Sequence, residues 1–395
     1  MHHTGESDRA YGGGESVPRP VPFADPNITA DDIAAVVKVL RSGWITTGPE
    51  CDALERELAD YLGCPHVVAV SSGTAAMEIA LASLDLPEGA RVAVPTWTFV
   101  ATAFAAVRNG ATPVLVDVDP HTLNMSPASL EAALGTGLSA VVAVHFGGVP
   151  VDPAVHELCA AAGVPLVEDA AHALGASDHR GRLWGQGSVA ACFSFYATKN
   201  VTSGEGGALA TADASLATFA RIYRLHGLSS ASWGRHRNGA NGRYACAMPG
   251  IKANLPDLLA ALARSQLARF ETSQSHRRAL VERYARVLAT IDRVEPVPAT
   301  VTPGAADHLQ VVLVPEGVDR DRVVAILAAA GVATSVHFQP LHRFEWFDRH
   351  AETAPGGVAV AEGLAERALS LPLHPGLDLD DVDRACHALA DALAT

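Results

Sequence analysis

The chain has 395 residues, of which 49% are apolar and only 18% are charged, and its formal net charge is −14. The length exceeds what one hydrophobic core usually supports, so two domains are expected, and a charged share below the ~25% of an average domain suggests surface hidden in an oligomer interface. The acidic balance argues against nucleic acid as a partner, because binding it needs a basic face. No apolar run reaches the ~20 residues needed to cross a bilayer, and no C-x-x-C pair is present. We therefore expect a protein of the reducing cytoplasm with no membrane partner and no disulfide framework.

Short β-branched runs alternate with alanine-rich stretches over much of the chain, after a polar, glycine-rich start that reads as a disordered tail over 1–20. Seven runs read as strands buried on both faces, at 67–70, 92–94, 113–118, 140–145, 164–168, 190–196 and 208–210. Helices are expected between them, at 74–84, 99–109 and 153–162. This alternation is typical of βαβ units in a mostly parallel sheet.

The pattern changes near residue 270. A helical stretch is predicted over 255–290, and strands near 308–314 and 332–338 with further helices indicate a smaller unit. The predicted fold class is therefore α/β, with a mostly parallel seven-stranded sheet flanked by helices in a large domain over 21–270. A smaller C-terminal α+β domain is expected over 271–395.

Two strand ends carry residues that could bind an anion or catalyse a reaction. Ser72, Gly73 and Thr74 follow the first strand and open a helix, where backbone N–H groups and the helix dipole favour a phosphate. Capping of that helix by Ser72 or Thr74 is the commoner outcome for such a string. The fifth strand runs into Asp169, with His172 close behind, at the edge where open α/β sheets bind ligands. Asp169 could equally cap a helix, and His172 could be a structural histidine with its hydrogen bonds satisfied.

Lys199 follows the sixth strand directly and precedes a glycine-rich turn at 204–207. A lysine buried among apolar or cationic neighbours has a depressed pKa and a nucleophilic amine, although most lysines after strands are simply solvated. Lys199, Asp169 and the phosphate-type helix start, each at a strand end of one sheet, form the set of groups that pyridoxal phosphate requires.

The local charge reverses between residues 214 and 256, where there are no Asp or Glu and six basic residues: Arg221, Arg224, Arg235, Arg237, Arg243 and Lys252. This could be a solvated basic loop, but arginine forks also suit a diphosphate-bearing substrate. The G-x-G-x-x-A match at 185–190 leads into a strand rather than the helix that a dinucleotide site requires. His337 and His342 have no carboxylates in ligand register, so no metal site is expected.

These motifs resemble those of the DegT/StrS type of nucleotide-sugar aminotransferases, which are pyridoxal-phosphate enzymes of the aspartate-aminotransferase fold (fold type I). The resemblance covers nearly everything after residue 20, and its motifs follow in the family's order. They are Gly43-Trp44-Ile45-Thr46-Thr47-Gly48-Pro49, Ser72-Gly73-Thr74, Thr98-Phe99-Val100-Ala101-Thr102, Asp117-Val118-Asp119, Glu168-Asp169-Ala170-Ala171-His172, 193–200 with 204–207, 250–254 and 337–342.

The resemblance implies catalytic roles for Lys199, Asp169 and His172. Lys199 would hold the cofactor covalently and shuttle the proton at the substrate carbon, while Asp169 would pair with the pyridine nitrogen. Phe99 would stack on the cofactor ring, with His172 near the ring hydroxyl. The same resemblance implies that the other cofactor contacts are Gly73, Thr74, Ser194 and, from the second subunit of a homodimer, Asn254.

Substrate contacts are expected at Arg243, Lys252, His337 and His342. In one departure from the family pattern, Leu255-Pro256-Asp257 stands where Met-Ser-Asp or Met-Thr-Asp is frequent, and a proline there fits a first helical turn.

The run from Lys199 to Gly207 resembles the K-N-x-T-x-G-E-G-G form of family members that act at carbon 4, whereas members acting at carbon 3 more often have K-N-L-G and an Asp before the paired glycines. The resemblance therefore predicts amination of a nucleotide-linked 4-keto-6-deoxy sugar, with glutamate as the donor. A 3-keto sugar or a cyclitol is the alternative substrate. A dehydratase of the same fold would have histidine in place of Lys199, and a non-catalytic regulatory protein would not need both Asp169 and Lys199.

Overall fold

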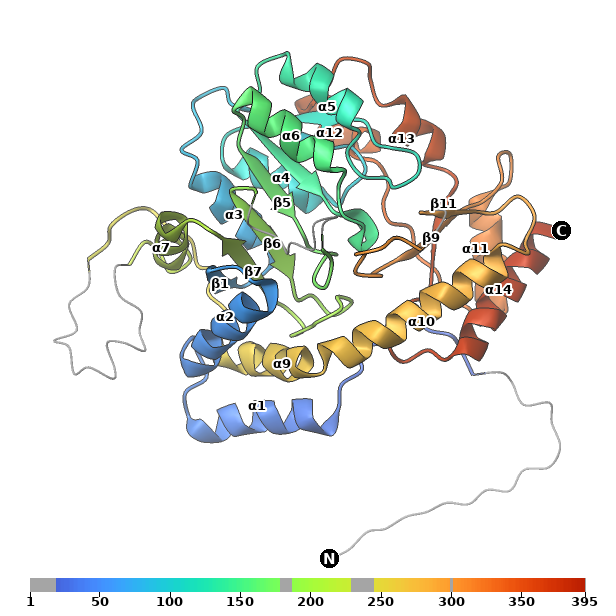
Figure 1. Ribbon diagram of the computed structural model, residues 1–395, viewed down its shortest axis with the longest axis horizontal. Helices are drawn as coiled ribbons and strands as arrows, with labels where there is room; N and C mark the ends of the chain where they lie inside the picture. The colour runs from blue at the N-terminus through green and yellow to red at the C-terminus, as the bar shows by residue number, and fades with distance from the viewer. Residues whose placement is uncertain (1–18, 178–186, 229–244, 299–300, 395) are drawn as a thin grey trace, which may run out of the picture.

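The computed structural model describes residues 19–177, 187–228, 245–298 and 301–394, which form two sheets covered by helices (Figure 1). The larger sheet has eight strands in the order β1-β7-β6-β5-β4-β2-β3-β10. Their bounds are β1 (His66–Val70), β2 (Arg91–Pro95), β3 (Thr112–Val116), β4 (Ala140–Val144), β5 (Leu166–Asp169), β6 (Ala190–Ser194), β7 (Gly207–Thr211) and β10 (Glu352–Thr353). β7 runs antiparallel to both of its neighbours and the other pairs are parallel, so the predicted α/β class with a mostly parallel sheet is confirmed.

All seven predicted strands are present, and β10 adds an eighth at the edge. Strand β10 has only two residues, both exposed, and it pairs with β3. The sequence therefore contains no run of buried side chains that would predict it. The middle strands are apolar on both faces because helices cover both, as the β-branched runs predict.

One face of the large sheet packs against α3 (Gly73–Ala82), α4 (Val100–Arg108), α7 (Ala214–Tyr223) and α12 (Glu345–His350). The opposite face packs against α2 (Pro49–Leu62), α5 (Pro127–Leu134), α6 (Pro153–Ala162) and α9 (Asp257–Ala268). Helix α1 (Ala30–Ser42) lies outside α2 and α9 in a further layer (Figure 1). The short turn η1 (Phe146–Gly148) follows β4.

The helical stretch predicted over 255–290 is two helices, α9 and α10 (Phe270–Leu288), with a break at Arg269. The predicted helical stretch is therefore present, with an interruption at one residue whose side chain has two partners. Arg269 Nη2 donates to Asn27 O at 2.7 Å and to the buried Asp32 carboxylate at 2.6 Å. These contacts tie the junction of the two helices to the start of α1.

The smaller sheet has the order β11-β9-β8 and comprises β8 (Glu295–Val297), β9 (Gln310–Leu313) and β11 (Ala368–Leu371). It packs with α10, α11 (Arg320–Ala329) and α14 (Leu379–Ala394) in one apolar cluster. The strand predicted at 332–338 is absent. Val332 and Ser335 make only isolated bridges, to Val21 and Ser370, because Ser335 and the residues at 337–338 face a cavity instead of a neighbouring strand.

After β9 and α11, the chain returns to the large sheet. The turn η2 (Leu341–Arg343), α12 and β10 pack there, and α13 (Ala359–Leu364) follows before β11. We propose a division of the chain near Phe270, at the junction of α9 and α10. Within the described residues, no helix is long and apolar enough to cross a membrane.

Candidate active site

A cavity of about 620 Å³ opens where the parallel strands of the large sheet end. It brings together eight of the residues predicted for the site: Gly73, Thr74, Phe99, Asp169, His172, Ser194, Lys199 and His337. They come from separate strand ends and from one segment of the C-terminal half, so the fold gathers them from positions far apart in the sequence.

The first wall of the cavity is the start of α3. Ser72 Oγ accepts a hydrogen bond from Ala75 N at 3.0 Å, so Ser72 caps the helix, while Gly73 and Thr74 line the cavity. A Cβ atom on Gly73 would lie 3.0 Å from Ser194 Cβ, so a side chain there would fill the space between α3 and β6. The bare backbone at Gly73 and the hydroxyl groups of Thr74 and Ser194 form a small cradle at the N-terminus of α3, which fits a phosphate.

Asp169 is the last residue of β5, and a turn follows it, so it does not cap a helix. Its carboxylate is buried and accepts two hydrogen bonds, from Thr102 Oγ1 at 2.8 Å and from Ala171 N at 3.1 Å. Burial raises the pKa of Asp169, while these hydrogen bonds and the charge of Lys199 oppose the shift. Thr102 was missed from the sequence, although it belongs to the motif at 98–102 and lies in the first turn of α4.

Lys199 lies in the loop that joins β6 to β7, and its backbone N–H donates to Tyr196 O at 2.9 Å. Burial of the amine lowers its pKa from 10.5 to about 8, and the negative charge of Asp169 acts in the opposite direction. A sizeable fraction of the amine is therefore neutral close to neutral pH, which a nucleophile requires.

This pKa gives a prediction for the cofactor-free protein. Trace acetylation of Lys199, followed by peptide mass analysis, should rise with pH to a midpoint near 8 and level off above it. The Asp169→Asn variant should lower that midpoint, because it removes the charge that favours the ammonium form. A midpoint at the ordinary lysine value, or an upward shift in the variant, would contradict this assignment of the cause.

His172 and His337 are held neutral in the cavity. Burial lowers the pKa of His172 well below its ordinary value and that of His337 to about 4. His172 Nδ1 accepts a hydrogen bond from Gly147 N at 3.2 Å, and His337 Nδ1 lies 3.0 Å from Ser370 Oγ. Both rings are thus fixed in orientation by a partner outside the cavity.

Two aromatic side chains form the mouth of the cavity. Phe99 precedes α4 and is 56% exposed, and its ring centroid lies 5.8 Å from that of Phe338. Phe338 was not predicted, although it stands in the motif at 337–342. His308, which also lines the cavity, gave no signal in the sequence beyond its place at the start of a predicted strand.

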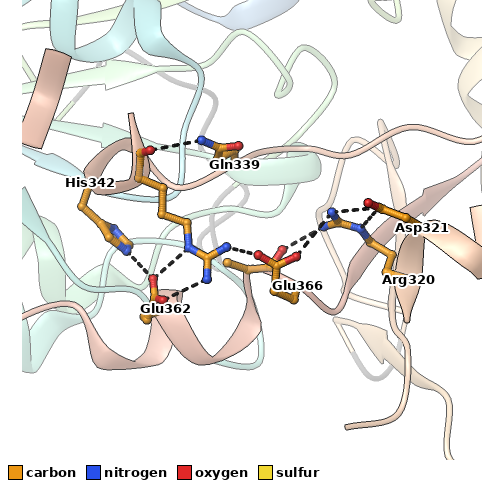
Figure 2. Close-up of polar contacts among 8 residues, drawn as sticks. Arg320, Asp321, Gln339, His342, Glu362 and Glu366 are labelled. Carbon is orange, nitrogen blue, oxygen red and sulfur yellow. Dashed lines mark hydrogen bonds and ion pairs between the residues drawn. The ribbon is translucent and has the colours of Figure 1, made fainter. Parts of the chain in front are cut away.

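Two predicted substrate residues, His342 and Lys252, lie apart from these. His342 is held outside the cavity lining by Thr96 Oγ1 and by Glu362, each at 2.8 Å from a ring nitrogen. Figure 2 shows His342 turned toward Glu362, and Arg343 links Glu362 to Glu366, which pairs in turn with Arg320. Lys252 is exposed and contacts Asn254, and Arg243 lies outside the described residues.

Asn254 does not line the cavity of its own chain. Its side-chain amide donates to Thr47 Oγ1 at 2.6 Å, next to β1. Two residues of the predicted basic run have structural partners, since Arg224 and Arg221 both pair with Glu55 at 2.6 and 3.2 Å. Arg235 and Arg237 lie outside the described residues, like Arg243.

The donor set fits pyridoxal phosphate: an enclosed lysine amine, a buried carboxylate with two hydrogen bonds, and a small cradle at a helix start surround one cavity. Metal binding has no comparable support, because the described part of the chain contains no group of three His, Cys, Asp or Glu residues that could hold a metal ion.

Comparison with known proteins agrees with this fit. A model of the DegT/DnrJ/EryC1/StrS aminotransferase family matches residues 26–390. The chain is 37% identical over 382 residues to the spore coat polysaccharide biosynthesis protein SpsC of Bacillus subtilis (strain 168), with 94% of this chain and 96% of the relative covered.

Two solved structures are similar over almost their whole length. Spr1654 from Streptococcus pneumoniae, a candidate sugar aminotransferase in its PMP form, has a TM-score of 0.86 and 30% identity, with 95% of this chain and 99% of that chain covered. It was also solved in a PLP form. S. venezuelae DesV, solved in complex with a ketimine intermediate, has a TM-score of 0.85 and 32% identity, with 96% and 100% covered.

Proposed function

Because the chain belongs to the DegT/DnrJ/EryC1/StrS aminotransferase family and is a pyridoxal-phosphate-dependent sugar aminotransferase, we propose that it transfers the amino group of glutamate to carbon 4 of a nucleotide-linked 4-keto-6-deoxy sugar. The observation that carries the catalytic part is the presence of Lys199 and Asp169 in the lining of one cavity, where the charge of Asp169 acts on the amine.

We propose that Lys199, Asp169 and His172 are the catalytic residues. Pyridoxal phosphate supplies an electron sink that stabilises negative charge at the substrate carbon. Lys199 would hold the cofactor through its amine and would move the proton at the substrate carbon, a task suited to an amine whose pKa is about 8. Asp169 would hold the pyridine nitrogen, and the hydrogen bond from Thr102 would keep the Asp169 carboxylate in position for it.

The remaining cofactor contacts are assigned to the cradle and the mouth of the cavity. Gly73, Thr74 and Ser194 would hold the phosphate, and Phe99 would cover the ring. His337, His342, Lys252 and Arg243 are kept as substrate residues in this proposal. Of these, His337 lines the cavity, and His342 would act through the segment at 337–342 that it anchors.

The choice of carbon 4 rests on the run from Lys199 to Gly207. This loop carries the lysine, and Glu205 within it lines the cavity, so its shape can decide which ring carbon reaches the reacting position. The test offers the enzyme and glutamate the 4-keto and 3-keto isomers of one nucleotide sugar and locates the new nitrogen by NMR. We expect preferential amination of the 4-keto isomer, and preference for the 3-keto isomer would overturn the assignment.

We also propose that the enzyme is a homodimer whose active sites are shared, with Asn254 contacting the cofactor phosphate of the partner. It is supported by the position of Asn254 outside the cavity of its own chain and by three exposed apolar side chains in and after α1, those of Ile33, Leu40 and Ile45. Analytical ultracentrifugation should show a dimer at assay concentration, and Asn254→Ala should weaken cofactor affinity about tenfold, as expected for a lost hydrogen bond to a charged group. An active monomer, or unchanged affinity in the variant, would contradict the shared site.

A reducing cytoplasmic location completes the proposal. It is supported by the six cysteines, which are all free thiols.

A further inference from the structure

His308 is a buried histidine of the cavity with a clear hydrogen-bonding arrangement on one side of its ring. It is 5% exposed, it lines the cavity with Lys199, and its ring centroid lies 4.5 Å from that of His172. Its Nδ1 lies 2.9 Å from Oδ1 of Asn200, the residue that follows the lysine. The direction of this hydrogen bond decides whether the other ring nitrogen, Nε2, can donate or accept a hydrogen bond.

The amide of Asn200 can be oriented from its own contacts. Its Nδ2 lies 2.7 Å from Ala306 O and 3.3 Å from Gln274 Oε1. A backbone carbonyl oxygen only accepts hydrogen bonds, so the group facing Ala306 must be the NH2 of the amide. The atom facing His308 is then the amide oxygen, which also only accepts. His308 Nδ1 must therefore carry a proton and donate it.

The imidazole ring of His308 carries only one proton. Burial, followed by the proximity of His172 and the charge of Lys199, lowers the pKa of His308 well below its ordinary value, so the ring is neutral. With the single proton on Nδ1, Nε2 keeps its lone pair. No hydrogen bond joins Nε2 to a described residue.

The neighbouring His172 has the opposite arrangement. Its Nδ1 accepts the N–H of Gly147, so the neutral ring carries its proton on Nε2. One histidine of the touching pair can therefore donate from Nε2, and the other can accept at Nε2. The cavity therefore contains two neutral imidazole rings in opposite tautomers, and a different protein group fixes the tautomer of each ring.

We propose that His308 is a specificity-determining residue whose Nε2 accepts a hydrogen bond from a hydroxyl group of the sugar, and that Asn200 is the positioning residue that fixes this tautomer. The assignment rests on the proposed function, because it takes the substrate to be a keto sugar. A hydroxyl group can donate to a lone pair, whereas a ketone oxygen cannot, so His308 recognises a part of the sugar other than its reacting carbonyl.

The tautomer can be measured without activity. In cofactor-free protein labelled with ¹⁵N in histidine, His308 should show a protonated Nδ1 and an unprotonated Nε2 over the neutral pH range, with assignment from the His308→Gln variant. Added keto sugar nucleotide should shift the Nε2 signal as it gains a hydrogen bond. A protonated Nε2, or an Nε2 signal that the sugar leaves unchanged, would overturn the inference.

Two variants of His308 test the contributions of Nδ1 and Nε2 separately. The amide of His308→Asn can replace Nδ1 against Asn200 but leaves nothing at the Nε2 position, whereas the amide oxygen of His308→Gln can reach the Nε2 position. We expect kcat/KM for the keto sugar to fall about 10- to 100-fold in His308→Asn and to recover partly in His308→Gln. The half-reaction with glutamate should stay within a few-fold of wild type in both, since it does not use the sugar hydroxyl.

An analogue of the sugar that lacks the recognised hydroxyl completes the design. The wild-type enzyme should discriminate against one deoxy analogue by the same factor, and His308→Asn should not. Equal losses in both half-reactions would mean that His308 is only structural, and would overturn the inference. If the wild-type enzyme aminated no nucleotide-linked keto sugar, the proposed function would fail, and the sugar contact of His308 would fail with it. A protonated Nε2, or an Nε2 signal unchanged by the sugar, in an enzyme that does aminate the sugar would overturn only the assignment of His308.

Discussion

We expect the Lys199→Ala enzyme to lose both half-reactions while it keeps its fold. In the proposed mechanism the amine is both the covalent attachment point for the cofactor and the group that moves a proton, and no other lysine lines the cavity. The loss should exceed about 10⁴-fold, the upper end of what a positioned proton-transfer group contributes by itself. Stopped-flow absorbance with glutamate measures the first half-reaction, and mass detection of the amino sugar measures the second.

The sequence makes the chemical test of this prediction unusually simple. The chain has only three lysines, Lys38, Lys199 and Lys252, and the other two are exposed. Borohydride reduction of the holoenzyme followed by peptide mapping should place the adduct on Lys199 alone. Lys38→Ala serves as the control, since Lys38 lies on the outer helix α1 and should leave the adduct and the turnover unchanged. An adduct on Lys38 or Lys252 would remove Lys199 from its role.

The second large effect is expected from Asp169→Asn, which keeps the size and shape of the side chain and removes its charge. The variant should retain cofactor, but its single-turnover rate with glutamate should fall roughly 10²- to 10³-fold, the size typical of losing one preorganised electrostatic contact at a reaction centre. The physical reason is that an amide cannot hold the pyridine nitrogen protonated as a carboxylate does.

Thr102→Val provides a graded comparison for Asp169. It removes the hydrogen bond to Asp169 Oδ2 but leaves the carboxylate charge and the bond from Ala171 N in place. We expect a loss of about tenfold, smaller than that of Asp169→Asn. Turnover of Asp169→Asn within a few-fold of wild type would show that the charge of Asp169 is not needed.

Local patterns predict the part of the site that lies on the large sheet. Lys199, Asp169 and the start of α3 each follow a buried strand, and parallel strands end at one edge of a sheet, so their convergence could be expected before any coordinates. The close approach of β7 to the helix start depends on a small residue. A Cβ atom on Gly207 would lie 2.6 Å from Gly73 N, which explains why that close approach requires glycine.

The other wall of the cavity could not be predicted in the same way. His308 and Phe338 reach it from two separate segments whose approach depends on packing between the two sheets, and no periodic pattern in the sequence encodes that packing. The position of His342 could not be predicted for the same reason. Its partners Thr96 and Glu362 are distant in the sequence, and they meet His342 only after α13 has packed near the turn η2. The missing strand at 332–338 has the same origin, since an apolar run predicts burial but not which surface buries it.

The antiparallel strand β7 has a consequence for how the molecule is made. Strand β1 stands at the edge of the large sheet, and its single strand neighbour is β7, with Val70 opposite Gly207. A growing chain emerges from the ribosome amino end first, so β1 and the helix start behind it wait without a partner until the chain beyond the lysine loop has been synthesised. Long-range pairing of this kind is slow compared with helix formation. The cradle and Lys199 are therefore brought together in the same late event, and a chain that stalls before Thr211 has no assembled pocket with which to capture its cofactor.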